Sequence, residues 1–453
     1  MNIHNFSEDL IGLEDFSNQL KTFMDTEIDF VEGSLVVALT SKYGSGKTTF
    51  LQMWKSLLED TNDKDNKTHV ISLNAWESDY YGDPLFAIIS AMVNALSKDG
   101  KSTDKLVSAV KDVGWFSTAL GGQVVNKFTG IDPVAAGKLA EHKKSRRDNS
   151  DKLIPDAFSA YEARRNAMIT LKNAISEFVS SSKPKVLFLV DELDRCRPDY
   201  AISYLETIKH IFDIKGTVFI IAADRNHLEN SAKTAFGQQL DFEEYYRKFV
   251  HREVTLPPIC ESGYKKLISY YINYYLEREG SRFCFLELDS TCSAQLSEFI
   301  GGLKLTPRQT QDVFRILGHI FDTSEDKRGK LRWTLGVASI AMASLKVGKP
   351  NIFESISIGK NKPEVILNIL TQIVEKGSVE WWFKLFLTGG CIEIKENEKV
   401  EDVLKHVGLM NEDNNSFSRA DLQQWFSNWG RNYNDQNKFN EIYIKIQQIS
   451  KWN

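Results

Sequence analysis

The 453-residue sequence has few cysteines, no long apolar run and no excess of charge of one sign. Its five cysteines are scattered and lack C-x-x-C spacing, which argues against a zinc site or a disulfide framework and predicts reduced thiols. The N-terminus is polar and acidic, without the basic and apolar segments of a secretory signal. A formal net charge of -5 disfavours nucleic acid or anionic lipid as a partner of the whole chain. We therefore expect an ordinary globular protein of the cytoplasm.

Two apolar stretches are candidates for membrane spans, and both are too short. A spanning helix needs roughly 18 or more nearly continuous apolar residues. Val113–Val125 is short and interrupted by glycine and glutamine, and Trp333–Leu345 lies between two basic residues. The second stretch reads better as a buried helix, so the sequence predicts no membrane span.

The first 260 residues contain four apolar, β-rich runs separated by segments of helical period. Strands that are apolar on both sides must be buried on both faces, so this pattern predicts an α/β domain with a parallel sheet between helices. The four runs are Leu35–Thr40, His69–Leu73, Val186–Val190 and Thr217–Ala223. A fifth strand, Arg252–Leu256, is expected to close the domain before Pro257 and Pro258, because proline cannot donate a ladder hydrogen bond.

The chain beyond Pro258 shows helical periodicity almost throughout. The helical candidates are Tyr264–Leu276, Cys292–Phe299, Pro307–Phe321, Leu331–Leu345, Pro363–Val374 and Asp421–Trp429. We therefore predict three regions: an α/β core over residues 1–258, a helical subdomain over 259–325 and a C-terminal helical domain over 326–453. A polar helical insertion is expected at about residues 99–150. It ends in the basic run His142–Arg147, a solvated loop or, in the alternative interpretation, a phosphate or partner contact.

A glycine-rich segment, "SKYGSGKT" (Ser41–Thr48), follows the first predicted strand and precedes a helical pattern. It matches the phosphate-loop (Walker A) pattern G-x-x-x-x-G-K-[ST] except that Ser41 replaces the first glycine, a change expected to perturb the loop only modestly. The inner glycines allow backbone N–H groups to converge on phosphate oxygens, and Lys47 would reach the β- and γ-phosphates. The Thr48 hydroxyl would bind Mg²⁺. The predicted phosphate-binding residues are Tyr43, Gly44, Ser45, Gly46, Lys47, Thr48 and Thr49.

A second motif lies where such a site needs a carboxylate. The run "VLFLVDE" (Val186–Glu192) delivers two acidic residues to the end of a predicted strand, as in a Walker B motif. Asp191 can bind the Mg²⁺ shell, and Glu192 can polarise an attacking water. The two motifs together predict a nucleoside triphosphate site.

With these motifs the chain resembles the KAP family of P-loop NTPases, which is related to the AAA+ and signal-transduction ATPases. The matching segments are "SKYGSGKTTF" (Ser41–Phe50), "LNAWESD" (Leu73–Asp79), "FLVDELDRCRPDYAISYLETIKHIF" (Phe188–Phe212), "VFIIAADR" (Val218–Arg225), "YYRKFVHREVTLPP" (Tyr245–Pro258) and "LTPRQTQDVFR" (Leu305–Arg315). The resemblance runs from about residue 6 to residue 320. Many members have a second aspartate where this chain has Glu192, and many have membrane helices in the insertion, which is polar here.

The resemblance also implies roles for single residues and for the nucleotide. It implies ATP with Mg²⁺, a sensor role for Asp224 near the γ-phosphate, and a second sensor at Arg308. Arg195 and Arg197 would support the acidic pair or act as a finger toward a neighbouring subunit, but an ion pair is the simpler interpretation, with Asp194 or its surroundings as the partner of Arg195. Asn74 and Trp76 are expected to be structural, with the tryptophan in the core; in the alternative interpretation, Asn74 faces the γ-phosphate from the end of its strand.

Three functions remain open from the sequence. The first is a Mg²⁺-dependent ATPase that acts as a conformational or assembly switch, which by family resemblance implies prokaryotic defence against phage. The second is a nucleotide-stabilised scaffold that recruits a separate effector with little hydrolysis, and the third is a nucleic-acid-dependent motor, which the acidic balance disfavours. A homo-oligomer or an effector protein bound through the C-terminal helices is the expected macromolecular partner.

Overall fold

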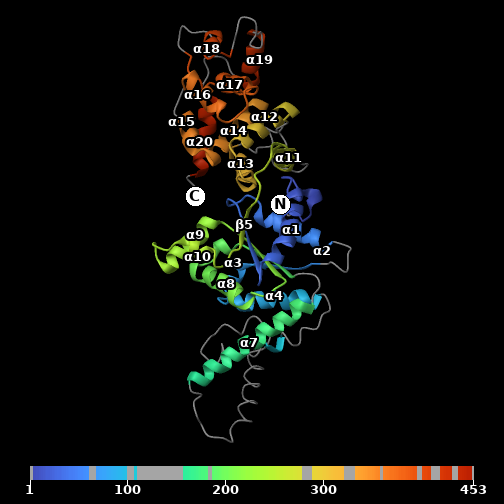
Figure 1. Ribbon diagram of the computed structural model, residues 1–453. Coiled ribbons are helices and arrows are strands. Elements are labelled where there is room, and N and C mark those ends of the chain that lie inside the picture. Colours follow the sequence, from blue (N-terminus) through green and yellow to red (C-terminus); the bar gives the residue numbers. More distant parts are fainter. Residues whose placement is uncertain are drawn as a thin grey trace. The chain divides into compact units, whose positions relative to one another are not determined.

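The computed structural model (Figure 1) describes residues 4–60, 68–98, 107–109, 157–181, 186–277, 288–320, 332–357, 361–394, 400–409, 419–430 and 437–450. The chain divides into two compact units. The first comprises Met1–Asp9, Leu13–Tyr43 and Lys47–Pro257, and the second comprises Leu10–Gly12, Gly44–Gly46 and Pro258–Asn453.

A five-stranded parallel sheet forms the centre of the first unit. Its strands are β1 (Leu35–Thr40), β2 (His69–Asn74), β3 (Val186–Asp191), β4 (Thr217–Ala223) and β5 (Arg252–Thr255), in the order β2-β3-β4-β1-β5. This confirms the predicted α/β class and the fifth strand. Asn74 pairs in register with Asp191, and Asp191 with Ala222, so the polar ends of neighbouring strands meet at one edge of the sheet.

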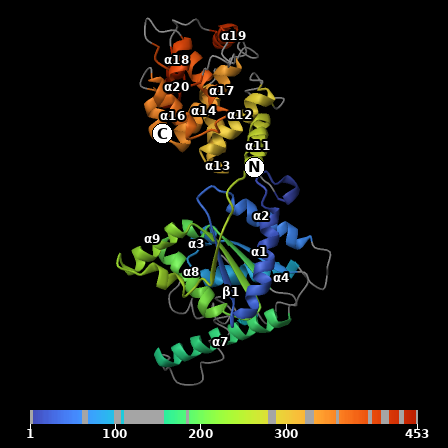
Figure 2. The ribbon, with the colours of Figure 1, turned by 45° about the horizontal axis from the view of Figure 1, so that its top comes forward.

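Helices cover both faces of this sheet, as strands that are apolar on both sides require. The helices of the first unit are α1 (Glu14–Glu27), α2 (Lys47–Glu59), α3 (Ala75–Asp79), α4 (Pro84–Lys98), α7 (Ala157–Ser181), α8 (Pro198–Ile211), α9 (Arg225–Phe236) and α10 (Phe242–Tyr246). Figure 2 shows α8 and α9 on one side of the strands and α1 and α2 on the other. On the α8 side, Phe188 stacks on Phe219 with ring centroids 4.4 Å apart, and Leu171 of α7 joins the same buried cluster.

The second unit is helical, as predicted. Its helices are α11 (Glu261–Ile272), α12 (Ser290–Gly302), α13 (Pro307–Ile320), α14 (Trp333–Gly348), α15 (Pro350–Ser357), α16 (Pro363–Thr371), α17 (Val379–Thr388), α18 (Val400–His406), α19 (Arg419–Trp429) and α20 (Lys438–Ser450). Helix α14 is buried at every position from Gly336 to Leu345, which confirms that this apolar stretch is a core helix. No helix among the residues with a described position combines the length and apolar character that crossing a bilayer requires.

Some predictions fall outside the described residues. They are most of the insertion at about 99–150, the basic run His142–Arg147, the stretch Val113–Val125 and the boundary near residue 325. The four cysteines that are described, Cys196, Cys260, Cys292 and Cys391, form no disulfide.

Candidate functional site

The glycine-rich loop connects β1 to α2, and its backbone shows why two of its glycines are needed. Gly44 has φ 77° and Gly46 has φ 105°, a conformation that side chains with a Cβ rarely adopt. Among the described residues, the non-glycine positions with positive φ are Glu192 and Lys304. Ser41 therefore has an ordinary backbone conformation, and serine can replace the first glycine of the pattern without backbone strain.

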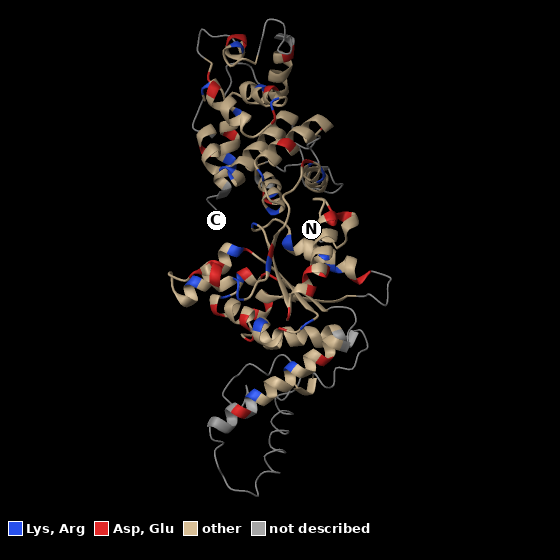
Figure 3. Ribbon diagram, viewed as in Figure 1, with Lys and Arg blue, Asp and Glu red and all other residues tan. Residues whose placement is uncertain are grey.

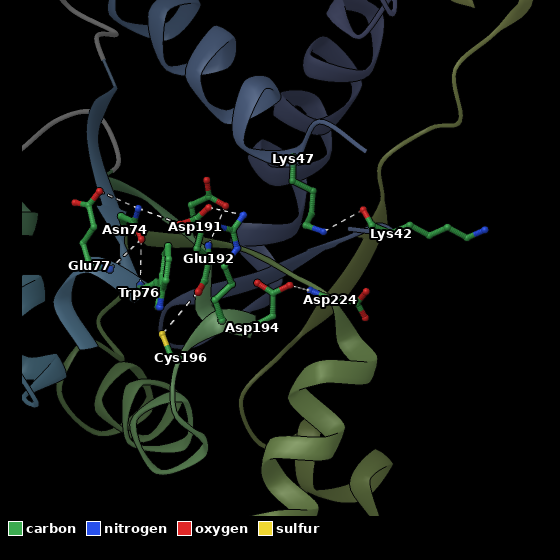
Figure 4. Close-up of polar contacts among 11 residues, drawn as sticks. Lys42, Lys47, Asn74, Trp76, Glu77, Asp191, Glu192, Asp194, Cys196 and Asp224 are labelled. Atoms are coloured by element: carbon green, nitrogen blue, oxygen red, sulfur yellow. Dashed lines mark hydrogen bonds and ion pairs between the residues drawn. The ribbon is translucent and has the colours of Figure 1, made fainter. Parts of the chain in front are cut away.

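Lys47 begins α2 and turns its ammonium group back toward the loop (Figure 4). Its Nζ donates to the carbonyl oxygens of Ser41 at 2.7 Å and Lys42 at 3.5 Å. The Oγ of Ser45, in the same loop, is buried and has no hydrogen-bond partner among the described residues. An ammonium group and an unsatisfied hydroxyl donor in one loop fit an anionic ligand such as a phosphate group.

The two predicted Mg²⁺ ligands lie close together, since the Thr48 side chain is near enough to the Asp191 carboxyl group to lower the pKa of that group. Burial raises the pKa of Asp191 above its ordinary value of 3.8, and the negative charge of Glu192 raises it further, while the Thr48 side chain works in the opposite direction. A hydroxyl and a carboxylate oxygen are the kind of ligands that Mg²⁺ binds together with water and phosphate oxygens. The donor set therefore fits Mg²⁺ accompanied by a nucleotide.

Glu192 follows β3 in a left-handed conformation, with φ 61° and ψ 26°. Both oxygens of its carboxylate are engaged (Figure 4): Oε1 lies 2.7 Å from Nη2 of Arg195, and Oε2 accepts from Nδ2 of Asn74 at 3.2 Å. The Asn74 side chain also caps α3, since its Oδ1 accepts from the backbone amides of Trp76 and Glu77. Asn74 thus links the end of β2 to the acidic residue after β3.

One expectation for this region is made more specific and one needs correction. The expected ion pair of Arg195 has Glu192, two residues before Asp194, as its partner, because the turn Leu193–Arg195 brings residues three apart to the same side. Trp76 is not in the core: it is 51% exposed, and its ring lies under the Arg195 guanidinium. The sequence could not reveal this exposure, because Trp76 stands in the first turn of a short helix, and tertiary packing sets which side of that helix faces solvent.

In the structure, Asp224 caps a helix and Arg197 forms an ion pair. The Asp224 side chain caps α9 by accepting from the Asn226 amide at 2.9 Å, and its own amide donates to Asp194 Oδ2 at 2.9 Å. Arg197 Nε donates to Asp79 Oδ1 at 2.9 Å, as expected for a structural ion pair. Its amide donates to the other oxygen of the same buried carboxylate. The sensor role of Asp224 stays a prediction.

Arg308 lies at the start of α13 in the second unit, to which Gly44–Gly46 also belong. Its backbone amide donates to the Gly44 carbonyl at 3.3 Å. The sensor role of its guanidinium stays a prediction.

The Cys196 thiol, close to the acidic motif, is poorly suited to act as a nucleophile. Burial, together with the negative charge of Asp79, raises the pKa of Cys196 to about 12, so the thiol is protonated at neutral pH. Its Sγ donates to the Glu192 carbonyl at 3.7 Å.

Comparison with protein families settles what kind of domain this is. The KAP family P-loop domain matches residues 15–321. The chain belongs to the KAP family of P-loop NTPases. The match includes every residue predicted for the site, from Tyr43 to Arg308, whereas α14 to α20 of this KAP NTPase lie beyond it.

Solved structures similar to this KAP NTPase include two proteins of Aeropyrum pernix. The ORC2 protein, in ADPNP-ADP complexes, has a TM-score of 0.40 and 11% identity, with 97% of this chain and 96% of that chain covered. The ORC1 protein, in complex with DNA, has a TM-score of 0.34 and 12% identity, with 88% of this chain and 83% of that chain covered. A search of curated proteins gave no match. At these TM-scores the structural likenesses carry no argument about function, so family membership rests on the matched domain.

Proposed function

We propose that this KAP NTPase binds ATP with Mg²⁺ and hydrolyses the γ-phosphate. The observation that supports this most is the proximity of Thr48, the last residue of the phosphate-loop motif, to Asp191, the acidic residue that ends the β3 strand and whose pKa the Thr48 side chain lowers. These residues are 143 positions apart in sequence, counted as 191 minus 48, and they supply the two oxygens that a Mg²⁺ ion beside a triphosphate needs.

Each residue has a defined part in this proposal. Lys47 and the amides of the glycine-rich loop would bind the β- and γ-phosphates, while Thr48 and Asp191 would hold Mg²⁺. Mg²⁺, when bound, neutralises charge on the phosphate oxygens. Glu192 would orient the attacking water and accept its proton, since it is the next carboxylate along the chain and follows the same strand end.

Replacing Glu192 with glutamine tests the proposal. The amide keeps the size of the side chain but cannot accept a proton, so kcat for phosphate release from saturating Mg·ATP should fall by about 10²-fold or more. The affinity for ATP should remain close to that of the wild type, which equilibrium binding would measure.

Glu229→Gln is a matched control, because it makes the same change at a carboxylate on α9 that pairs with Lys233. It should leave kcat within about twofold of the wild type, as a surface ion pair contributes little. If wild type and Glu192→Gln bind ATP equally and neither releases phosphate, hydrolysis is excluded and the scaffold with a separate effector replaces the enzyme.

We further propose that the nucleotide state controls a partner, which the C-terminal helices would bind, and that the protein acts in the cytoplasm in defence against phage. This part rests on family resemblance alone. Acidic and basic residues are intermixed along the described helices (Figure 3), and this supports a protein partner over nucleic acid. Salt-sensitive binding of DNA with stimulation of ATP turnover would contradict this choice.

A further inference from the structure

The guanidinium group of Arg195 lies within cation–π distance of two aromatic rings of the first unit. Its Cζ is 5.4 Å from the ring centroid of Tyr43 and 5.4 Å from that of Trp76. Tyr43 comes from the loop after β1 and Trp76 from the helix after β2, so these contacts connect two segments that are 33 residues apart, counted as 76 minus 43. A guanidinium that contacts two aromatic rings has fewer accessible positions than one that contacts a single ring.

The same guanidinium holds one oxygen of Glu192. The carboxylate is 14% exposed and Arg195 is 33% exposed, so their 2.7 Å ion pair is partly shielded from water. Asn74 occupies the other oxygen at 3.2 Å. The carboxylate is therefore fixed at both ends, and the left-handed backbone of Glu192 leaves it little freedom to turn.

We infer that Arg195 is a positioning residue: held by cation–π contacts with Tyr43 and Trp76, it restrains the Glu192 carboxylate, and hydrolysis requires this ion pair to open. The inference rests on the proposed function. A general base needs an oxygen within hydrogen-bond reach of the attacking water, about 2.6–3.2 Å. Since Oε1 is held by a charge-assisted contact, its release precedes proton transfer.

The Tyr43 contact also connects this restraint to the phosphate loop. Tyr43 directly precedes Gly44 in the loop predicted to bind phosphate. A change in this loop on phosphate binding would therefore act on a residue that contacts Arg195.

Replacing Arg195 with alanine tests the inference through the steady-state rate of phosphate release. We expect kcat to rise about tenfold, which corresponds to about 1.4 kcal/mol of activation free energy, while KM for ATP stays within about twofold. Trp76→Ala should raise kcat in the same direction, since it removes one support of the guanidinium. The double variant Arg195→Ala/Trp76→Ala should be no faster than Arg195→Ala, because both changes act through one contact.

Three further variants make the result interpretable. Arg165→Ala removes an exposed arginine that pairs with Glu162 on α7, and should leave kcat unchanged. Arg195→Lys, which keeps the charge but not the planar guanidinium, should give an intermediate kcat. Arg195→Ala/Glu192→Gln should be inactive, which shows that the faster turnover still uses Glu192.

The outcomes separate the inference from the proposed function. If wild type hydrolyses ATP, Glu192→Gln does not, and a folded Arg195→Ala has the same or a lower kcat, Arg195 does not restrain Glu192 and the inference is wrong. If wild type and Arg195→Ala both bind ATP and neither releases phosphate, the proposed hydrolysis itself is wrong. Circular dichroism and the melting temperature confirm that each variant is folded.

Discussion

At neutral pH, folding and Mg²⁺ binding favour different ionisation states of the Asp191 carboxyl group. Burial raises its pKa above 3.8, so folding favours the neutral form of the group. A group whose pKa is raised on folding stabilises the folded state fully below its unfolded pKa, and this contribution is lost as pH rises through the folded pKa. The ionised form that Mg²⁺ needs therefore destabilises the protein when no metal is bound.

Asp191→Asn should for this reason raise the melting temperature at neutral pH in buffer without Mg²⁺ or nucleotide. The difference from the wild type should shrink as pH falls toward about 4, because the wild-type carboxyl then becomes neutral as well. Differential scanning calorimetry across this pH range measures the effect. If the melting-temperature difference between Asp191→Asn and the wild type is the same at every pH, burial of the charge is not its cause. The same conclusion follows if the variant gains less in melting temperature over the wild type at pH 7 than at pH 4.

Spacing and residue type predict Lys47, Thr48, Asp191 and Glu192 as one group of residues, because glycine loops and strand-end carboxylates are local patterns. The proximity of Thr48 to Asp191 agrees with that grouping. The partners of Glu192 were not predictable. They depend on β2 lying beside β3 and on which side of α3 faces solvent, and both are set by packing.

The strands show how far apolar patterns determine elements. All five predicted strands are present, and β1 and β4 have the predicted bounds. Strands β2 and β3 each extend one residue further, to Asn74 and Asp191, because these polar residues still pair in the ladder. The first polar residue of each sequence pattern therefore shows where the strand leaves the core. The last ladder hydrogen bond shows where the strand ends.

The helical unit depends on close packing at Gly302, the last residue of α12. A Cβ at this position would lie 1.7 Å from the Ile373 carbonyl oxygen, which is backbone and cannot rotate away. Gly302→Ala should therefore destabilise the second unit by about 1–3 kcal/mol, the usual cost of overpacking. The shift in the urea midpoint of its unfolding transition, followed by tryptophan fluorescence, gives the measurement.

Gly377→Ala provides the matched control, since no atom lies within 4 Å of the position of its Cβ. Its midpoint should match that of the wild type. Equal midpoints for both glycine variants and the wild type would mean that α12 does not pack against the Ile373 backbone as described.

The whole chain combines a sheet unit that carries the family's motifs with a helical unit that extends beyond the matched domain. The α/β class, the helical C-terminal half and the family could all be predicted, because each rests on periodicity or on motifs of fixed spacing. What α14 to α20 bind could not be predicted, since a helical surface has no comparable local pattern. The function of the molecule depends on whether the sheet unit takes up a nucleotide.

Titration calorimetry of a non-hydrolysable ATP analogue in Mg²⁺ buffer tests that dependence directly. Wild type should bind with one site per chain, and Lys47→Ala should bind about 10- to 100-fold more weakly, because it loses charge-assisted hydrogen bonds to phosphate. Lys42→Ala, whose side chain points away from Lys47 in Figure 4, should bind like the wild type. A folded wild type that takes up no analogue, or a Lys47→Ala variant with unchanged affinity, would contradict the account.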